Sequence, residues 1–232
     1  MLEISGLNQY YGESHTLWDV ELSVPKGSCT CLMGRNGAGK TTLLRSVMGL
    51  LPIAPGGRIH FEGKELAGHP VEWRARLGIG YVPQGREIFP QLTVEENLRV
   101  GLLARGKGAR KIPELIFELF PVLKDMLKRR GGNLSGGQQQ QLAIGRALAA
   151  SPKLLILDEP TEGIQPNIVH EIGGILIRLN REQGLPLLLV ETKLPFARRV
   201  AHRFCILDNG RSVAHGDIGS LDDDLISRHL TV

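Results

Sequence analysis

The glycine-rich stretch Gly34-Arg-Asn-Gly-Ala-Gly39-Lys40-Thr41 decides the fold. It fits the pattern GxxxxGK[ST], follows the apolar run Cys29 to Met33, and precedes a helical pattern that starts at Thr41. Glycines let the backbone turn its N–H groups toward phosphate oxygens, and the helix N-terminus adds positive potential. Lys40 would reach the β- and γ-phosphates, and Thr41 would ligate Mg²⁺. The stretch therefore predicts a nucleotide site, whose expected binding residues are Gly34, Asn36, Gly37, Ala38, Gly39, Lys40, Thr41 and Thr42.

Two adjacent carboxylates follow a second apolar run. Leu154 to Leu157 is typical of a parallel strand buried on both faces, and it ends in Asp158 and Glu159. An open α/β sheet presents its ligands at this end of a strand. We expect Asp158 to hold the hydrated Mg²⁺ and Glu159 to orient or deprotonate the attacking water. Such a pair alone is often a solvated turn, but beside a phosphate loop it indicates nucleotide hydrolysis.

The remaining hydrophobic periodicity indicates one α/β unit that carries a helical lobe. Ile168 to Leu179 has helical spacing and lies between the apolar runs 154–157 and 187–190, which gives a β-α-β unit. Residues 93–150 are predicted to be mostly helical, with glycine breaks at 106–108 and 131–137. Strands and turns are expected elsewhere: strands within 1–33 with turns at 11–12 and 25–27, a hairpin around 59–63, and a strand over 77–82.

These elements predict an α/β fold in which a single domain spans residues 1–232. Its core would comprise about 1–90 and 151–232, with an N-terminal antiparallel β subdomain, and an α-helical subdomain would be inserted at about 91–150. A chain of 232 residues is long enough for such a core and lobe, whereas a second full domain would be cramped.

The composition is that of a globular protein. Hydrophobic residues make up 42% and charged residues 22%, which excludes a disordered or fibrous chain. The net charge of +4 is too small to identify an anionic partner, and the basic runs at 128–130 and 198–199 are typical of solvated faces. We therefore infer no nucleic-acid partner.

Cysteine usage and hydropathy point to a reducing compartment. Cys29 and Cys31 share one side of an apolar strand, and with Cys205 they are expected to be buried strand residues rather than metal ligands or disulfides. The longest apolar run, Leu185 to Val190, is far shorter than the roughly 18 to 20 residues that span a bilayer. The N-terminus shows no secretion signal. We expect a cytoplasmic protein that does not cross a membrane.

A second phosphate-binding element appears at Leu134-Ser135-Gly136-Gly137-Gln138, again at the start of a helical pattern. One nucleotide does not need two such elements. Here the chain resembles, over nearly its whole length, the ATP-binding cassette (ABC) family of P-loop NTPases, whose signature motif is LSGGQ. In that family two subunits pair head to tail, and each ATP lies between one subunit's P-loop and the other's LSGGQ. The resemblance implies ATP and Mg²⁺ as cofactors and explains the duplication.

The resemblance also assigns further residues. Tyr11 matches the aromatic residue that stacks on adenine, and Gln84 in Tyr81-Val-Pro-Gln84 matches the glutamine that touches Mg²⁺ and senses the transporter. Without the resemblance, Tyr11 is a surface turn aromatic and Gln84 a plain loop residue. The implied signature ligands are Ser135, Gly136, Gly137 and Gln138; the metal set is Thr41, Gln84 and Asp158; the catalytic set is Glu159, Gln84 and Thr192.

Two positions depart from the family pattern. Gln165 stands where most members carry the aspartate that contacts the opposite subunit, and Thr192 falls on the position of the switch histidine. A threonine is smaller, carries no charge near neutral pH and offers one hydroxyl to the γ-phosphate. The switch role of position 192 is therefore in doubt, although Glu159 remains.

Within the family, three segments resemble the ATPases of branched-chain amino-acid importers, and more closely their urea-importer branch. They are Gln84 to Pro90, Gln138 to Arg146, and Thr161 to Pro166. The resemblance implies an ATP-hydrolysing subunit of a bacterial importer, for urea or alternatively for branched-chain amino acids or short amides. Its partners would be a sister ATPase chain or a second copy, and separate permease subunits at the inner face of the membrane.

Two alternatives of other classes stay open. A cassette ATPase without a transporter, acting on ribosomes or in DNA repair, usually carries two cassettes or long coiled insertions, and this chain has neither. A degenerate subunit that binds ATP but scarcely hydrolyses it would be a regulatory partner. Thr192 is the residue that keeps this second alternative open.

Overall fold

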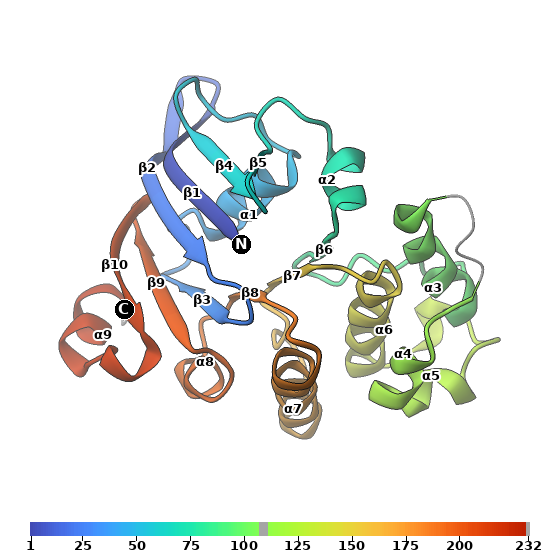
Figure 1. The fold of residues 1–232 in the computed structure, drawn as a ribbon. Coiled ribbons are helices and arrows are strands. Elements are labelled where there is room, and N and C mark those ends of the chain that lie inside the picture. Colours follow the sequence, from blue (N-terminus) through green and yellow to red (C-terminus); the bar gives the residue numbers. More distant parts are fainter. Residues whose placement is uncertain (107–110, 231–232) are drawn as a thin grey trace.

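The protein is described by a computed structural model that covers residues 1–106 and 111–230. Two β-sheets with helices packed on them form one body, and a group of helices lies beside it (Figure 1). None of the helices in these ranges is both long and apolar enough to cross a membrane. The arrangement confirms the predicted α/β class.

The central sheet of the described residues has six strands in the order β10-β9-β3-β8-β7-β6. All neighbours are parallel except β9 and β10, which are antiparallel. Strands β3, β7 and β8 are buried throughout, as their mostly apolar sequences predict. The strands are β3 (Cys29–Met33), β6 (Ile79–Val82), β7 (Leu154–Asp158), β8 (Leu187–Val190), β9 (Arg203–Asp208) and β10 (Arg211–Asp217).

The register of this sheet brings the functional loops to one edge. Val190 pairs with Leu32 on one side and with Asp158 on the other. The loops that leave β3, β7 and β8 therefore begin side by side at the carboxyl ends of parallel strands, where such a sheet binds its ligands.

A second, antiparallel sheet is built mainly from the N-terminal part of the chain. Its order is β2-β1-β4-β5, and β1 alternates buried with exposed residues over its first half, as expected when only one face is covered. The strands are β1 (Leu2–Tyr11), β2 (Ser14–Val24), β4 (Arg58–Phe61) and β5 (Lys64–Glu65).

Helix α1 (Lys40–Met48) shares one hydrophobic cluster with both sheets. Leu44 and Val47 of α1 belong to the same cluster as Leu7 of the antiparallel sheet and Ile156 and Leu188 of the central sheet, all of them fully buried. On the opposite face of the central sheet, Leu155 and Leu189 pack into a second cluster with the apolar side chains of other helices. They include α6 (Gly136–Ala149), α7 (Pro166–Gln183) and α8 (Leu194–Val200).

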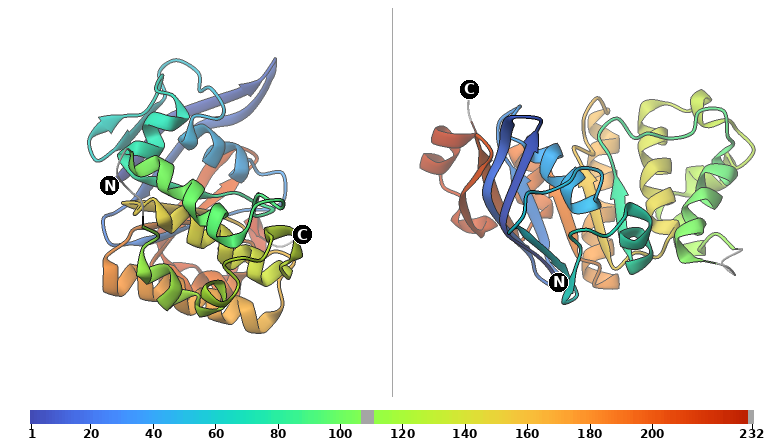
Figure 2. Two further views of the ribbon diagram at one scale, coloured as in Figure 1. Left: turned by 90° about the vertical axis from the view of Figure 1, so that its right-hand side faces the viewer. Right: turned by 90° about the horizontal axis from the view of Figure 1, so that it is seen from above.

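The helices labelled α3, α4 and α5 in Figure 1 lie to one side of the sheets, next to α6 (Figures 1 and 2). Gly145 of α6 lets Leu98 and Ile116 approach its backbone, because a Cβ there would lie 3.2 Å from both side chains. The lobe consists of α3 (Val94–Leu102), a 3₁₀ turn (Leu103–Arg105), α4 (Glu114–Leu119), α5 (Pro121–Asp125), another 3₁₀ turn (Gly131–Asn133) and α6. Helix α9 (Asp223–His229) follows β10 through a 3₁₀ turn (Ile218–Ser220).

Two details differ from the sequence predictions. Leu77 ends a short helix, α2 (Val71–Leu77), that periodicity did not reveal, and β6 begins only after the left-handed Gly78. Gly136 and Gly137 belong to the first turn of α6 instead of the predicted break, because the preceding Ser135 caps the helix. Of the break predicted at 106–108, Gly106 follows the 3₁₀ turn, and 107 and 108 lie outside the described residues.

The cysteines occupy the expected places. Cys29 and Cys31 of β3 and Cys205 of β9 are free thiols and are buried. Burial raises the pKa of Cys29 and of Cys205 to about 12. Thiols held in this protonated form are poor nucleophiles and poor metal ligands.

Candidate functional site

The glycine-rich loop joins β3 to α1 by close backbone packing. A Cβ on Gly34 would overlap the carbonyl of Leu207 in β9, so only glycine fits. Gly39 precedes α1 with a left-handed φ of 102°, which also favours glycine. The turn after β9 supports the loop as well, since the Gly210 amide donates to the Ala38 carbonyl at 3.0 Å. Asn36 and Gly37 at the tip are exposed.

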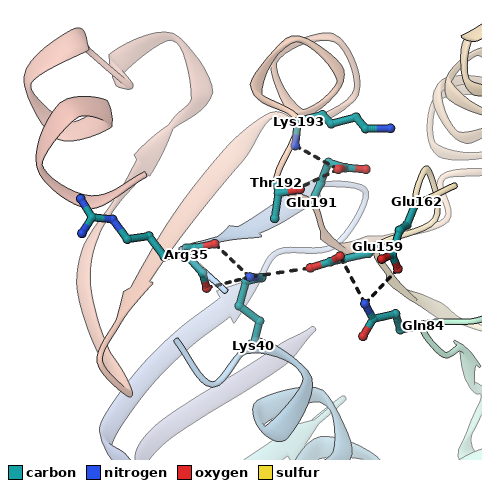
Figure 3. Close-up of polar contacts among 9 residues, drawn as sticks. Arg35, Lys40, Gln84, Glu159, Glu162, Glu191, Thr192 and Lys193 are labelled. Atoms are coloured by element: carbon teal, nitrogen blue, oxygen red, sulfur yellow. Dashed lines mark hydrogen bonds and ion pairs between the residues drawn. The ribbon is translucent and has the colours of Figure 1, made fainter. Parts of the chain in front are cut away.

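The ammonium group of Lys40 lies inside this loop. Its Nζ atom donates to the carbonyl oxygens of Gly34 and Arg35 at 2.9 and 3.0 Å, and it stands 3.7 Å from Oε1 of Glu159 (Figure 3). The side chain is only 5% exposed. A buried positive charge with one carboxylate near it is suited to bind the anionic oxygens of a phosphate chain.

Asp158, at the end of β7, is a buried carboxylate without full hydrogen bonding. Neither of its oxygens has a partner in hydrogen-bond geometry among the described residues. The nearby Thr41 hydroxyl lowers the pKa of Asp158, but by less than burial raises it. Burial raises the pKa of Asp158 from 3.8 to about 6. An orphaned buried carboxylate beside a threonine hydroxyl has the oxygen donors that Mg²⁺ prefers. The residues therefore fit the metal that the sequence analysis expects.

Glu159 and Gln84 meet across two loops. The amide nitrogen Nε2 of Gln84 lies 3.5 Å from Oε2 of Glu159 and donates to Oε2 of Glu162 at 2.9 Å (Figure 3). Glu159 has a left-handed φ of 46°, uncommon for a residue with a side chain, and its amide donates to the Val190 carbonyl. Backbone strain of this kind is typical of functional positions. The structure thus brings Lys40, Gln84 and Glu159 together, as expected.

The loop after β8 is organised by a residue that sequence reasoning missed. Glu191 is buried, and its carboxylate accepts from the Thr161 hydroxyl at 2.7 Å and from the amides of Thr192 and Lys193 at 2.9 and 3.0 Å. Burial raises the pKa of Glu191, and the three donors oppose that rise. Lys193 also donates to the Thr161 carbonyl at 2.9 Å. A glutamate at the end of an apolar run was the only available signal.

Thr192 is exposed at the start of this loop. Its backbone is fixed by Glu191 on the same edge as Lys40 and Glu159, and its side chain is labelled beside them in Figure 3. A hydroxyl at this place has the donor and acceptor capacity to contact a terminal phosphate. The structure therefore places Thr192 at the same edge of the sheet as Lys40 and Glu159.

Tyr11 lies beside the first turn of α1. Its hydroxyl is 3.5 Å from Oγ1 of Thr42, and nearly half of the residue is exposed. An exposed aromatic ring next to the phosphate loop is placed where the base of a bound nucleotide could stack on it.

The signature segment opens on another cleft. Ser135 caps α6: its hydroxyl accepts from the Gln138 amide at 3.3 Å, and Oε1 of Gln138 accepts from the Ser135 amide at 3.0 Å. Amides in the first helical turn, here those of Gly136 and Gly137, have no acceptor within the helix. Among the described residues that line this cleft are Val122, Gln165 and Ile168, but none from 34–42. One chain therefore does not join its two phosphate elements.

Comparison with known proteins shows the family of the chain. Residues 17–162, well over half of the chain, match the family described as ABC transporter. The chain belongs to the ABC transporter family. It is an ATPase cassette, and it binds ATP.

Several relatives of the cassette align over nearly its whole length. It is 45% identical to the high-affinity branched-chain amino acid transport ATP-binding protein BraG of Pseudomonas aeruginosa, covering 93% of this chain and 92% of the relative. It is 36% identical to the probable branched-chain amino acid transport ATP-binding protein LivF of Archaeoglobus fulgidus, covering 95% and 94%.

Solved cassettes share the fold. A cassette described as a dimer in a post-hydrolysis state with ADP and Pi superposes with a TM-score of 0.84 at 26% identity, covering 94% of this chain and 99% of the other. An ATP-binding subunit of an ABC transporter gives 0.82 at 31% identity, covering 98% and 92%. The similarity to BraG and LivF, and not these structures, agrees with the resemblance to the branched-chain and urea importer group.

The raised pKa of Asp158 predicts a pH dependence of stability. Because the folded pKa is about 6 and the reference value 3.8, the native state holds a proton that the unfolded chain releases between pH 4 and 6. The stabilisation of the native state by this proton is present below pH 4 and is lost as the pH rises through 6. Its loss lowers the free energy of unfolding by about 3 kcal/mol. Urea unfolding of the nucleotide-free protein at pH 4.5 and 7.5 should therefore show Asp158→Asn gaining stability relative to wild type at the higher pH. Parallel pH profiles would contradict this.

Proposed function

We propose that this cassette is the ATP-hydrolysing subunit of a membrane importer whose channel is a separate permease. The observation that carries the proposal is the convergence of Lys40, Asp158, Glu159 and Gln84 at one edge of the sheet, with the signature segment facing another cleft. Such a chain holds one half of each of two nucleotide sites, so a second cassette is needed to complete them.

Within its own half-site each residue has a distinct task. The loop amides and Lys40 would bind the β- and γ-phosphates, and Tyr11 would support the base. Thr41, Asp158 and Gln84 would hold Mg²⁺, which when bound neutralises charge on the phosphate oxygens. Glu159 would take a proton from the attacking water, and Thr192 would contact the γ-phosphate.

The partner cassette would contribute its own signature segment. By the same symmetry, Ser135, Gly136, Gly137 and Gln138 of this chain would contact the nucleotide held by the partner. The amides of Gly136 and Gly137, which have no acceptor within α6, would serve as donors. The partner would be a sister chain or a second copy. We further propose that residues 1–232 act as one domain, with a core at about 1–90 and 151–232 and a helical subdomain at about 91–150, located at the inner face of the membrane.

For the imported substrate we propose branched-chain amino acids. The similarity to BraG and LivF supports this choice. Urea is the second candidate, favoured by the segments Gln84 to Pro90 and Thr161 to Pro166, which resemble the urea branch. Substrate does not touch this subunit, so neither choice follows from its active-site geometry.

The experiment is ATPase activity of the transporter reconstituted in proteoliposomes with its permease, its second cassette and its substrate-binding protein. Leucine-loaded binding protein should stimulate hydrolysis above the unloaded protein, whereas urea should not. Stimulation by urea alone would replace the proposed substrate, and a rate that ignores the permease would contradict the importer role.

A further inference from the structure

The loop that follows Gln84 is held in an unfavourable backbone conformation. Gly85, Arg86 and Glu87 have φ values of 78°, 73° and 44°, so three successive residues are left-handed and two of them carry side chains. A left-handed backbone is unfavourable for the two residues with side chains, Arg86 and Glu87, and it persists only where the surroundings impose it. The contacts of this loop should therefore show what imposes the conformation.

One set of contacts comes from helix α6. The guanidinium group of Arg146 donates to the carbonyl of Glu87 at 2.8 Å and to that of Arg86 at 3.4 Å. It also stands 5.2 Å from the centre of the Phe89 ring. The helix that begins with the signature segment thus holds the backbone of the loop that begins with Gln84.

The other contacts come from the side chain of Arg86. Its Nη1 atom donates to Oε1 of Gln139 in α6 at 3.4 Å, and its Nη2 atom to the carbonyls of Glu162 and Gly163 at 3.4 and 3.5 Å. The group packs against Gly136, where a Cβ would lie 3.0 Å from Nη1. Arg86 therefore bridges the signature helix and the segment after Glu159.

The three segments that Arg86 connects belong to two different half-sites. Gln84, two residues earlier, contacts Glu159 and Glu162 of the chain's own half-site. Gly136 belongs to the signature segment, which in the proposed function faces the partner's nucleotide. The guanidinium group of Arg86 suits this bridge, because a planar group with several N–H donors can bind acceptors on two segments at once.

We propose that Arg86 is a positioning residue that couples the two nucleotide half-sites of this chain. The inference rests on the proposed pairing of cassettes. When the signature segment engages the partner's ATP, a shift of α6 acts through Arg86 on the Glu162 segment and on the Gln84 loop, and so on the approach of Gln84 to Glu159. The hydrogen bonds of Arg86 go to Gln139, Glu162 and Gly163, none of which is assigned to nucleotide or metal, so its loss should change how the sites cooperate more than how one site binds.

The test uses Arg86→Asn in the assembled transporter, since asparagine accepts a left-handed backbone but is too short to span both walls. The rate of ATP hydrolysis is measured against ATP concentration. Half-saturating ATP should rise roughly three- to tenfold, the value expected for a few long hydrogen bonds from a charged group, and the Hill coefficient should fall. ATP affinity of the isolated subunit should not change. Arg86→Lys keeps one ammonium donor group, so its half-saturating ATP concentration and Hill coefficient should lie between those of the wild type and of Arg86→Asn.

Arg76→Gln serves as the matched control, because Arg76 is an exposed arginine of α2, and it should reproduce the wild-type curve. A wild-type Hill coefficient and half-saturation in Arg86→Asn would overturn the proposal. Equal loss of ATP affinity in the isolated subunit would also overturn it, because it would make Arg86 a local support of one site. Failure of the proposed function is distinguishable: hydrolysis would then survive Glu159→Gln or would not depend on the permease.

Discussion

Glu159→Gln should keep ATP bound and lose hydrolysis by roughly 10²- to 10⁴-fold, the contribution of a general base. The amide keeps the shape of the carboxylate and its place 3.7 Å from Lys40 and 3.5 Å from Gln84, but it cannot take a proton from water. ATP that is bound and not hydrolysed should hold two cassettes together. Steady-state ATPase assays and light scattering with ATP measure the two effects.

Two further variants make this result specific. Glu162→Gln changes the other carboxylate that Gln84 contacts and should retain most of the hydrolysis. Adding Ser135→Arg to Glu159→Gln should abolish the ATP-held pair, because bulk and charge would enter the shared interface. Wild-type turnover in Glu159→Gln would assign the base to another residue, and loss of turnover in both glutamate variants would point to charge balance instead.

Lys40→Ala should weaken ATP binding about a hundredfold or more. The ammonium is the charge that the loop encloses, and hydrogen bonds from a charged group contribute about 1.5 to 3 kcal/mol each. Two such bonds to phosphate oxygens correspond to at least two decades in the dissociation constant. Calorimetric titration with ATP measures this loss.

Lys26→Ala is the control for that experiment, since Lys26 is exposed in the turn before β3. It should bind ATP as the wild type does. Removal of Lys40 also removes its bonds to the carbonyls of Gly34 and Arg35, so the melting temperature of both variants should be recorded. Unchanged ATP affinity in a folded Lys40→Ala protein would contradict the assignment of the loop.

The parts of the fold that the sequence predicts well are those with one dominant physical signal. The runs 154–157 and 187–190 are buried and every residue in them is apolar, so the strand pattern is unambiguous. Helix α2 escaped because its seven residues include charged ones such as Glu72 and Arg76 and give little periodicity. Glycines 136 and 137 were misjudged because a good cap offsets their low helix propensity.

The candidate site divides in the same way. Lys40, Asp158 and Glu159 belong to motifs of adjacent residues, which can be recognised in a single sequence. Glu191 and Arg86 act through contacts with residues about 30 to 80 positions away, and no spacing rule connects such partners. Their roles became visible only when the loops were placed in space.

The position of α1 between two sheets has a mechanical consequence. Helix α1 packs against both sheets through side chains such as Leu44 and Val47. A helix packed tightly on two sides has little freedom to tilt when a ligand binds. The region around the phosphate loop should therefore be rigid. Any movement that closes the protein on a nucleotide should be made by the helical lobe, α3 to α6. We expect the bending to occur between the sheets and the helical lobe, where the strained loop after Gln84 lies.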